Sequence, residues 1–200
     1  MPVVTNPFPQ LVMYQAGLFD PANEIAMIER QGFGLVILRA QFYPPPVLAA
    51  LGEGVSTLSN VLFADDTQVM LDGLGKLGFT IEVNEAGNTA QVTGAGGKIP
   101  RATADLFCGN SGTTLRFLTA LCCLGHGTYI LDGVERMRER PIAQLQAMLR
   151  NLGARIYTDY NEGYPPVRLM PRGLPGGIVK FSGAQSSQYL SAVLMVAPYA

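Results

Sequence analysis

The sequence predicts an α/β (α+β) fold with mixed sheets, built from a repeated βαβαββ unit. Three observations support this prediction: an internal repeat, apolar residues at helical spacing in each copy, and pairs of short β-rich runs after each helix. Residues 51–54 (LGEG) correspond to residues 124–127 (LGHG), an offset of about 73 residues. Self-similarity of this kind indicates that one supersecondary unit occurs more than once.

Each unit is predicted in the same order after its LGxG turn. In chain order the expected elements are strand 56–62, helix 66–77, strands 80–83 and 90–93, strand 128–131, helix 141–152, and strands 155–158 and 167–170. Pro141 suits the first turn of its helix, and Gly78 and Gly153 suit the position after a helix end. A last helix, residues 186–197, begins another unit, so we expect an incomplete domain.

The composition indicates a globular chain, because 48% of the residues are hydrophobic and only 14% are charged. A net charge of −1 predicts no general attraction to nucleic acid or to a membrane surface. No secretory signal is recognisable, and no apolar run is long enough to span a bilayer. The three cysteines, Cys108, Cys122 and Cys123, have no disulfide or zinc spacing, so we interpret them as core residues of a cytoplasmic protein.

Two motifs suggest an anion site. Residues 109–114 (GNSGTT) form a glycine-rich turn before an apolar run, which presents free N–H groups at a helix start. The string 136–140 (RMRER) concentrates arginines, whose planar forks suit carboxylates and phosphates. An ordinary helix cap and a solubilising surface are the alternative interpretations. Residues 183–188 (GAQSSQ) occupy the place in the repeat that GNSGTT occupies.

Other polar residues are interpreted as structural. His126, the only histidine, is expected in a turn, which disfavours histidine-based catalysis. Asp65 and Asp66 precede a predicted helix, where carboxylates favour the helix dipole, so we interpret them as caps.

Four strings together resemble the 5-enolpyruvylshikimate-3-phosphate synthase (3-phosphoshikimate 1-carboxyvinyltransferase) family. They are STLSNVLFADDTQVMLDGLGKLG, LFCGNSGTTLRFLTA, LDGVERMRERPI and SSQYLSAVLMVAPYA. The resemblance extends over about residues 48–200 and implies the enolpyruvyl transferase fold, with only an incomplete first domain in residues 47–200. Residues 1–46 do not resemble the family, and we expect them to be a divergent segment.

The resemblance implies transfer of the enolpyruvyl group of phosphoenolpyruvate to shikimate 3-phosphate in aromatic amino acid biosynthesis, without a metal or an organic cofactor. It implies no catalytic group in this portion, since the family's acid–base groups belong to a C-terminal domain that this chain does not contain. The residues that it assigns to ligands are Gly112, Arg136 and Gln188 for phosphoenolpyruvate, Ser186, Ser187 and Gln188 for shikimate 3-phosphate, and Asn110, Thr113 and Arg116 as supporting residues on the side where glyphosate binds.

The chain also departs from the family pattern. Ungapped alignment places Arg39 at a family lysine, Ala40 at the following serine and Pro44 at an arginine. Three consecutive prolines, 44–46, are expected to damage the helix that follows. Phe117 stands where many members have proline, which leaves glyphosate sensitivity open.

Three functional hypotheses remain after these departures. The chain is an enzyme half that needs a complementary C-terminal piece, or it is an inactive fragment that at most binds ligand. The third is the related UDP-N-acetylglucosamine enolpyruvyl transferase, which uses a loop cysteine. No cysteine here is predicted in such a loop, and RMRERPI and SSQYL fit that relative poorly.

Overall fold

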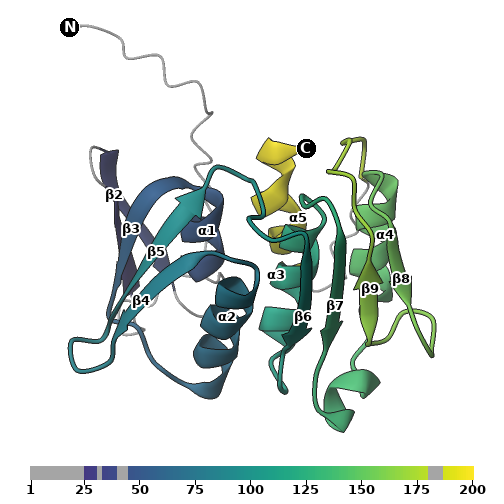
Figure 1. The fold of residues 1–200 in the computed structure, drawn as a ribbon, viewed down its shortest axis with the longest axis horizontal. Coiled ribbons are helices and arrows are strands. Elements are labelled where there is room, and N and C mark those ends of the chain that lie inside the picture. Colours follow the sequence, from purple (N-terminus) through teal and green to yellow (C-terminus); the bar gives the residue numbers. More distant parts are fainter. Residues whose placement is uncertain (1–24, 31–32, 40–44, 180–186) are drawn as a thin grey trace, which may run out of the picture.

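Two β-sheets enclose a central group of helices (Figure 1). The computed structural model describes residues 25–30, 33–39, 45–179 and 187–200, with the backbone alone for the first two ranges. The elements of the first half are β1 (Ile25–Arg30), β2 (Phe33–Arg39), α1 (Pro45–Leu51), β3 (Glu53–Ser59), α2 (Asp65–Lys76), β4 (Thr80–Asn84) and β5 (Thr89–Ala95). Those of the second half are β6 (Thr103–Phe107), α3 (Gly112–Cys122), β7 (Thr128–Asp132), the 3-10 helix η1 (Glu135–Glu139), α4 (Ala143–Asn151), β8 (Ile156–Thr158), β9 (Val167–Leu169), α5 (Ser187–Val196) and the 3-10 helix η2 (Ala197–Tyr199).

The second unit is a complete βαβαββ unit, in agreement with the predicted repeat. Its strands are ordered β6-β7-β9-β8, with β6 parallel to β7 and the other pairs antiparallel. The first unit repeats the arrangement from α1 to β5 but differs at its start. The strand beside β3 is β1, which runs antiparallel, whereas β6 runs parallel beside β7. The sheet β2-β1-β3-β5-β4 is therefore wholly antiparallel, and only the second sheet is mixed.

The prediction that the prolines damage the following helix is wrong. Helix α1 begins at Pro45, and Pro46 is its second residue. Proline is tolerated there because the first N–H groups of a helix have no intrahelical acceptor, so none is lost. Pro44 lies outside the described residues.

The start of α4 differs from the prediction, whereas the ends of α2 and α4 agree with it. Helix α4 begins at Ala143 and not at Pro141, because the N–H of Ile142 donates to the carbonyl oxygen of Gly163 (2.8 Å) and Ile142 has φ −127°. The predicted role of Gly78 and Gly153 is confirmed, since they follow α2 and α4 with φ of +93° and +90°. Positive φ is the conformation in which glycine ends a helix without strain.

Helix α3 forms the centre of the core. Almost every side chain from Thr114 to Cys122 is buried, and α3 contacts α1, α2, α5, β7 and β9. A helix that is apolar on all sides must be covered on all sides, which explains why helices pack beside it between the two sheets (Figure 1). In the described ranges, no helix combines the length and the apolar character that crossing a bilayer requires.

The tight contact between α2 and α3 gives a first prediction. A Cβ on Gly73 would lie 2.5 Å from Cδ1 of Leu118, whose side chain is fully buried, whereas a Cβ on Gly75 in the same helix would meet nothing within 4 Å. Gly75→Ala should stabilise the fold by about 0.5–1 kcal/mol through helix propensity. Gly73→Ala should be less stable than Gly75→Ala by about 1–3 kcal/mol because it overpacks the core.

Urea unfolding of the two variants, followed by circular dichroism, measures this difference. Equal stabilities would contradict the close approach of α2 to α3.

Candidate functional site

The GNSGTT turn is fixed to the neighbouring strand by backbone hydrogen bonds. The N–H of Cys108 donates to the carbonyl oxygen of Asp132 (2.7 Å), and the N–H of Val134 donates to that of Gly109 (3.0 Å). These bonds place the turn beside the start of η1, which follows β7 (Figure 1). The glycine-rich turn and the arginine string are therefore neighbours at one end of the second sheet.

Ser111 caps helix α3 at the end of this turn. Its Oγ accepts hydrogen bonds from the backbone N–H (3.1 Å) and the hydroxyl (2.9 Å) of Thr114. The N–H groups of Gly112 and Thr113 have no acceptor among the described residues. They are two of the orphan donors of a helix start, and such donors favour a negatively charged ligand.

Gln188 connects the amino end of α5 to the amino end of α3. Its Oε1 accepts a hydrogen bond from Nη1 of Arg116, and its Nε2 donates to Oγ1 of Thr113 (3.3 Å). Three residues that the sequence assigned to one site, although they are far apart in the chain, thus touch in the structure. Each group of an amide can make a further bond, so Gln188 keeps one acceptor position and one donor hydrogen for a ligand.

The side chain of Tyr189 contacts Arg116 and the chain segment that follows η1. The guanidinium of Arg116 lies over its ring, 5.1 Å from the centroid, and its hydroxyl donates to the carbonyl oxygen of Pro141 (2.8 Å). A cation over an aromatic face gains electrostatic energy from the ring quadrupole. Tyr189 thereby joins α3, α5 and the end of the arginine string.

Gly112 has a guanidinium group on either side. A Cβ at this position would lie 2.7 Å from Nη1 of Arg140 and 3.4 Å from Nη1 of Arg116. Both arginines are half-buried. The sequence pattern gives Arg140 no separate role, because nothing in the string distinguishes it from its neighbours.

Most other arginines of this region have acidic partners. Arg136, predicted to bind phosphoenolpyruvate, lies in η1 with its side chain 75% exposed and pairs with Glu139 (3.3 Å). Its hydrogen bonds and ion pairs among the described residues do not include the group around Gln188. The remaining pairs are Arg138 with Asp132 (2.5 Å) and Arg150 with Glu162 (2.9 Å).

The ion pair of Arg138 changes the titration of its partner. Burial acts to raise the pKa of Asp132, but hydrogen bonds from Arg138 and from the backbone of Gly133, together with the charge of Arg138, lower it overall. Asp132 is therefore ionised at neutral pH and neutralises Arg138.

The remaining predicted site residues lie at the edge of this group. Asn110 is exposed in the turn, and Ser187 is the exposed first residue of α5. Ser186 lies outside the described residues, as does Ala40, and the side chain of Arg39 is not described. Phe117 is buried in α3, one residue after Arg116.

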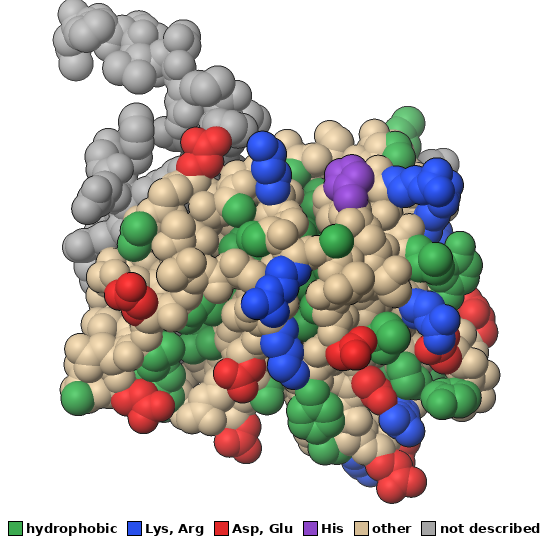
Figure 2. Space-filling model, in the orientation of Figure 1, with side chains coloured by type: hydrophobic (Ala, Val, Ile, Leu, Met, Phe, Trp, Pro, Cys, Tyr) green, Lys and Arg blue, Asp and Glu red, His purple; other side chains and the backbone are tan. Residues whose placement is uncertain are grey.

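The central helices α3 and α5 run in the same direction, so their amino ends lie together and give the site its electrostatic character. The amino ends of α3 and α5 meet at Gln188, and the hydroxyl of Tyr199, beyond α5, donates to the carbonyl oxygen of Leu51 at the end of α1 (2.7 Å). Helix amino ends bear partial positive charge. On the face seen in Figure 2, acidic and basic side chains are interspersed.

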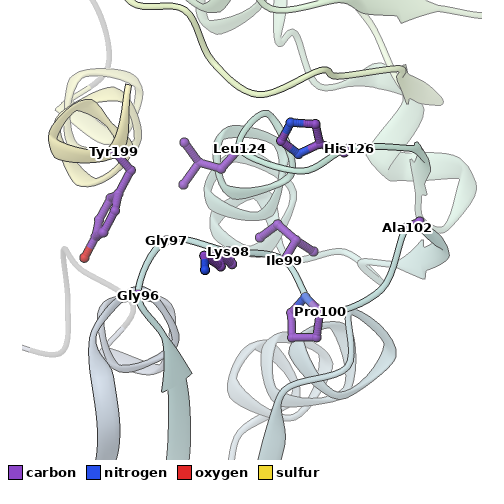
Figure 3. Close-up of a pocket in the computed structure, with 9 residues that line it drawn as sticks. All are labelled: Gly96, Gly97, Lys98, Ile99, Pro100, Ala102, Leu124, His126 and Tyr199. Carbon is purple, nitrogen blue, oxygen red and sulfur yellow. The ribbon is translucent and has the colours of Figure 1, made fainter.

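A cavity of about 520 Å³ lies at the opposite end of the central helices (Figure 3). It is separated from the site by the length of α3, about 16 Å. Its lining residues are Gly96, Gly97, Lys98, Ile99, Pro100, Ala102, Leu124, His126 and Tyr199. Carboxyl ends of helices bear partial negative charge, which Lys98 complements. His126 is exposed between α3 and β7, where it forms an isolated β-bridge with Arg172 and not the predicted turn.

Within the ranges that the structure describes, no three His, Cys, Asp or Glu side chains gather closely enough to hold a metal ion.

Comparison with known proteins identifies the family. The model of the EPSP synthase (3-phosphoshikimate 1-carboxyvinyltransferase) family matches residues 45–200. The chain belongs to the EPSP synthase family.

Members of this family are similar to the chain both in sequence and in fold. The chain is 46% identical over 154 residues to a 3-phosphoshikimate 1-carboxyvinyltransferase of Trichormus variabilis, covering 77% of this chain and 36% of that protein. It is 47% identical over 162 residues to the chloroplastic enzyme of Brassica napus, covering 77% of this chain and 31% of that protein. EPSP synthase from Acinetobacter baumannii superposes with a TM-score of 0.71 at 26% identity, covering 78% of this chain and 36% of that one. The chain thus spans about a third of the length of these EPSP synthases.

The fold similarity confirms the predicted enolpyruvyl transferase fold, of which this chain includes one incomplete domain. The alternative of the related UDP-N-acetylglucosamine enolpyruvyl transferase is not supported, because the family model and the relatives are EPSP synthases.

The three thiols of this EPSP synthase chain are inert in the folded state. Cys108, Cys122 and Cys123 are free and fully buried, as predicted for core residues. Burial, together with the charge of Asp132, raises the pKa of Cys108 from 9.0 to about 12. Burial also raises the pKa of Cys122 and of Cys123. The thiols therefore stay protonated and shielded in the folded chain.

We expect a thiol-specific colorimetric reagent at pH 8 to modify the three cysteines only after denaturant is added. Each thiol binds its proton more tightly in the folded state, so its contribution to stability is complete below about pH 9 and decreases as the pH rises toward 12. Stoichiometry of the reaction with and without denaturant measures the protection. Rapid modification of any thiol in the folded protein would contradict this prediction.

Proposed function

We propose that the chain forms one wall of a site for phosphoenolpyruvate and shikimate 3-phosphate, and that it acts as an enzyme half together with a C-terminal portion. In the proposed reaction the 5-hydroxyl of shikimate 3-phosphate attacks C2 of phosphoenolpyruvate while a proton adds to C3. The tetrahedral adduct then loses phosphate and a proton to give the enolpyruvyl ether. Such a reaction depends on acid–base groups and on stabilisation of developing charge.

The contact of Gln188 with both Thr113 and Arg116 is the observation that most supports this proposal. It brings the two polar helix starts, GNSGTT and SSQ, into one connected group. Two orphan N–H groups, two half-buried guanidiniums and a row of hydroxyls are donors suited to phosphate and carboxylate oxygens.

Within this proposal, phosphoenolpyruvate lies over Gly112 between Arg136 and Gln188. Shikimate 3-phosphate lies toward Ser186, Ser187 and Gln188, and Gln188 contacts both ligands. Asn110, Thr113 and Arg116 maintain the shape of the phosphoenolpyruvate side. Arg136 must exchange its exposed ion pair with Glu139 for the ligand, which is feasible because an exposed pair contributes little free energy.

Three further aspects belong to the same proposal. The chain is a fragment whose acid–base groups come from the C-terminal portion. Glyphosate occupies the phosphoenolpyruvate side of the site. The protein acts in the cytoplasm, which agrees with three free thiols in its core.

Reconstitution tests the proposed activity. The chain is mixed at several ratios with a separately purified C-terminal portion of the Trichormus variabilis relative, and phosphate release is measured with both substrates present. We expect release only from the mixture, because neither part holds a whole site. Each part alone and a mixture without shikimate 3-phosphate are the controls. If no ratio releases phosphate while the chain still binds ligand, the inactive binding fragment is the correct interpretation.

Arg136→Ala tests the predicted phosphoenolpyruvate contact. Losing a charge-assisted hydrogen bond should cost about 1.5–3 kcal/mol, which is roughly ten- to a hundredfold in affinity. Calorimetric titration with phosphoenolpyruvate in the presence of shikimate 3-phosphate measures the change. Arg168→Ala is a matched control, because Arg168 is also exposed and paired with an acid, Asp159. An equal loss in both variants would assign Arg136 to surface solubility.

A further inference from the structure

Asp132, the last residue of β7, is bonded to both motifs of the site. Its backbone carbonyl oxygen accepts the N–H of Cys108 (2.7 Å), which precedes the GNSGTT turn. Its carboxylate accepts hydrogen bonds from Nε (3.1 Å) and Nη2 (2.5 Å) of Arg138 in η1. In this bidentate geometry a guanidinium and a carboxylate fix each other's direction as well as their distance. One residue therefore links the glycine-rich turn to the arginine string.

Helix η1 has a buried anchor beside this pair. The side chain of Met137 is fully buried, and its backbone N–H donates to the carbonyl oxygen of Val134 (2.8 Å). A Cβ on Gly133 would lie 2.2 Å from the carbonyl oxygen of Gly109 and 2.8 Å from Cβ of Met137, so the turn, the end of β7 and η1 pack closely. One buried side chain fixes the position of a five-residue helix but not its direction. The ion pair with Asp132 supplies the direction.

The ion pair of Arg136 with Glu139 has no such effect. Both residues lie within η1, so this contact moves with the helix. Arg138 lies in the same short helix as Arg136. A tilt of η1 that releases Arg138 from Asp132 therefore also moves Arg136 relative to the amino end of α3.

We propose that Asp132 and Arg138 are positioning residues, which hold η1 so that Arg136 faces the phosphoenolpyruvate side of the site. This inference rests on the proposed function, because it specifies how the string presents that ligand contact. Neither residue touches the ligand. By its charge alone, the carboxylate of Asp132 would weaken the binding of a nearby anion. A positioning role and a charge effect therefore predict opposite consequences when this carboxylate is neutralised.

Asp132→Asn separates the two effects. Its affinity for phosphoenolpyruvate, measured by calorimetric titration in the presence of shikimate 3-phosphate, should fall about fivefold, which is the equilibrium shift that a half-exposed bidentate pair can supply. Loss of a negative charge alone would instead raise this affinity. Arg138→Lys keeps the positive charge but lacks the planar fork, and it should weaken binding to a similar extent. An unchanged or higher affinity in Asp132→Asn would overturn the inference.

Asp159 and Arg168 provide a matched control. Their side chains are 27% and 47% exposed, against 26% and 49% for Asp132 and Arg138. Their ion pair (2.9 Å) joins β9 to the segment after β8, and not η1 to β7. Asp159→Asn and Arg168→Lys should therefore leave the affinity for phosphoenolpyruvate unchanged. An equal loss in these two variants would assign the effect to surface charge in general and would refute the positioning role.

Hydrogen exchange in the ligand-free chain tests the positioning of η1 without relying on binding. The backbone N–H of Arg140 donates to the carbonyl oxygen of Met137 (3.0 Å) at the end of η1. Its exchange should be about fivefold faster in Asp132→Asn, because η1 opens more often when the pair is weakened. The N–H groups inside α3 should keep their exchange rates. Unchanged exchange at Arg140, or faster exchange throughout α3, would contradict a role confined to η1.

The outcomes distinguish this inference from the proposed function. If the unsubstituted chain does not bind phosphoenolpyruvate, the proposed function itself fails. If it binds phosphoenolpyruvate and Asp132→Asn binds it equally well, only the positioning role of Asp132 and Arg138 fails.

Discussion

The burial of helix α3 on all sides is the constraint on which the rest of the structure depends. Its side chains from Leu115 to Cys122 are apolar or small, apart from Arg116, and they are covered by helices and strands of both units. A helix of this composition cannot lie at the surface without exposing a large apolar area. The two sheets and the helices α2 and α5 therefore pack around it. Its polar groups are concentrated at the amino end, where Ser111, Thr113 and Arg116 are found.

The repeat explains why polar groups from distant segments meet at that end. Helices α3 and α5 occupy equivalent places in successive units, so they pack side by side and in the same direction. Their polar first turns then become neighbours, and Gln188 joins them through Arg116 and Thr113. A motif that is ambiguous in one unit becomes informative when its counterpart lies against it, because two helix starts supply orphan donors and positive partial charge to one region.

The two ends of this helix group differ in electrostatic character. The amino ends hold the guanidiniums of Arg116 and Arg140, which have no acidic partner among the described residues, near two N–H groups that have no acceptor there, and these groups favour an anion. The carboxyl ends border a cavity whose lining includes Lys98 (Figure 3), and a cation is favoured at helix carboxyl ends. An anion therefore has a physical reason to bind at the amino ends of these helices and not at their carboxyl ends.

Local patterns in the sequence were sufficient for many of the helices and strands and for much of the core, but they did not predict β1, β2 or β6. The apolar spacing at Met70, Leu71 and Leu74 predicted α2 to within a residue at either end, and the glycines that end α2 and α4 were recognised. The cap at Ser111 and the burial of the three thiols also follow from local composition. These features depend on neighbours within a few residues in the chain, which a single sequence displays.

Only the tertiary structure decided which polar groups face one another. It placed Arg140 beside Gly112, left Arg136 exposed beside Glu139, and paired β1 antiparallel with β3. It also showed that Pro45 and Pro46 can begin a helix. The sequence by itself determined a repeated α/β unit with anion-binding residue types at its helix starts. Which of the neighbouring arginines lies beside Gly112 required the fold, because it depends on contacts between segments that no local spacing relates.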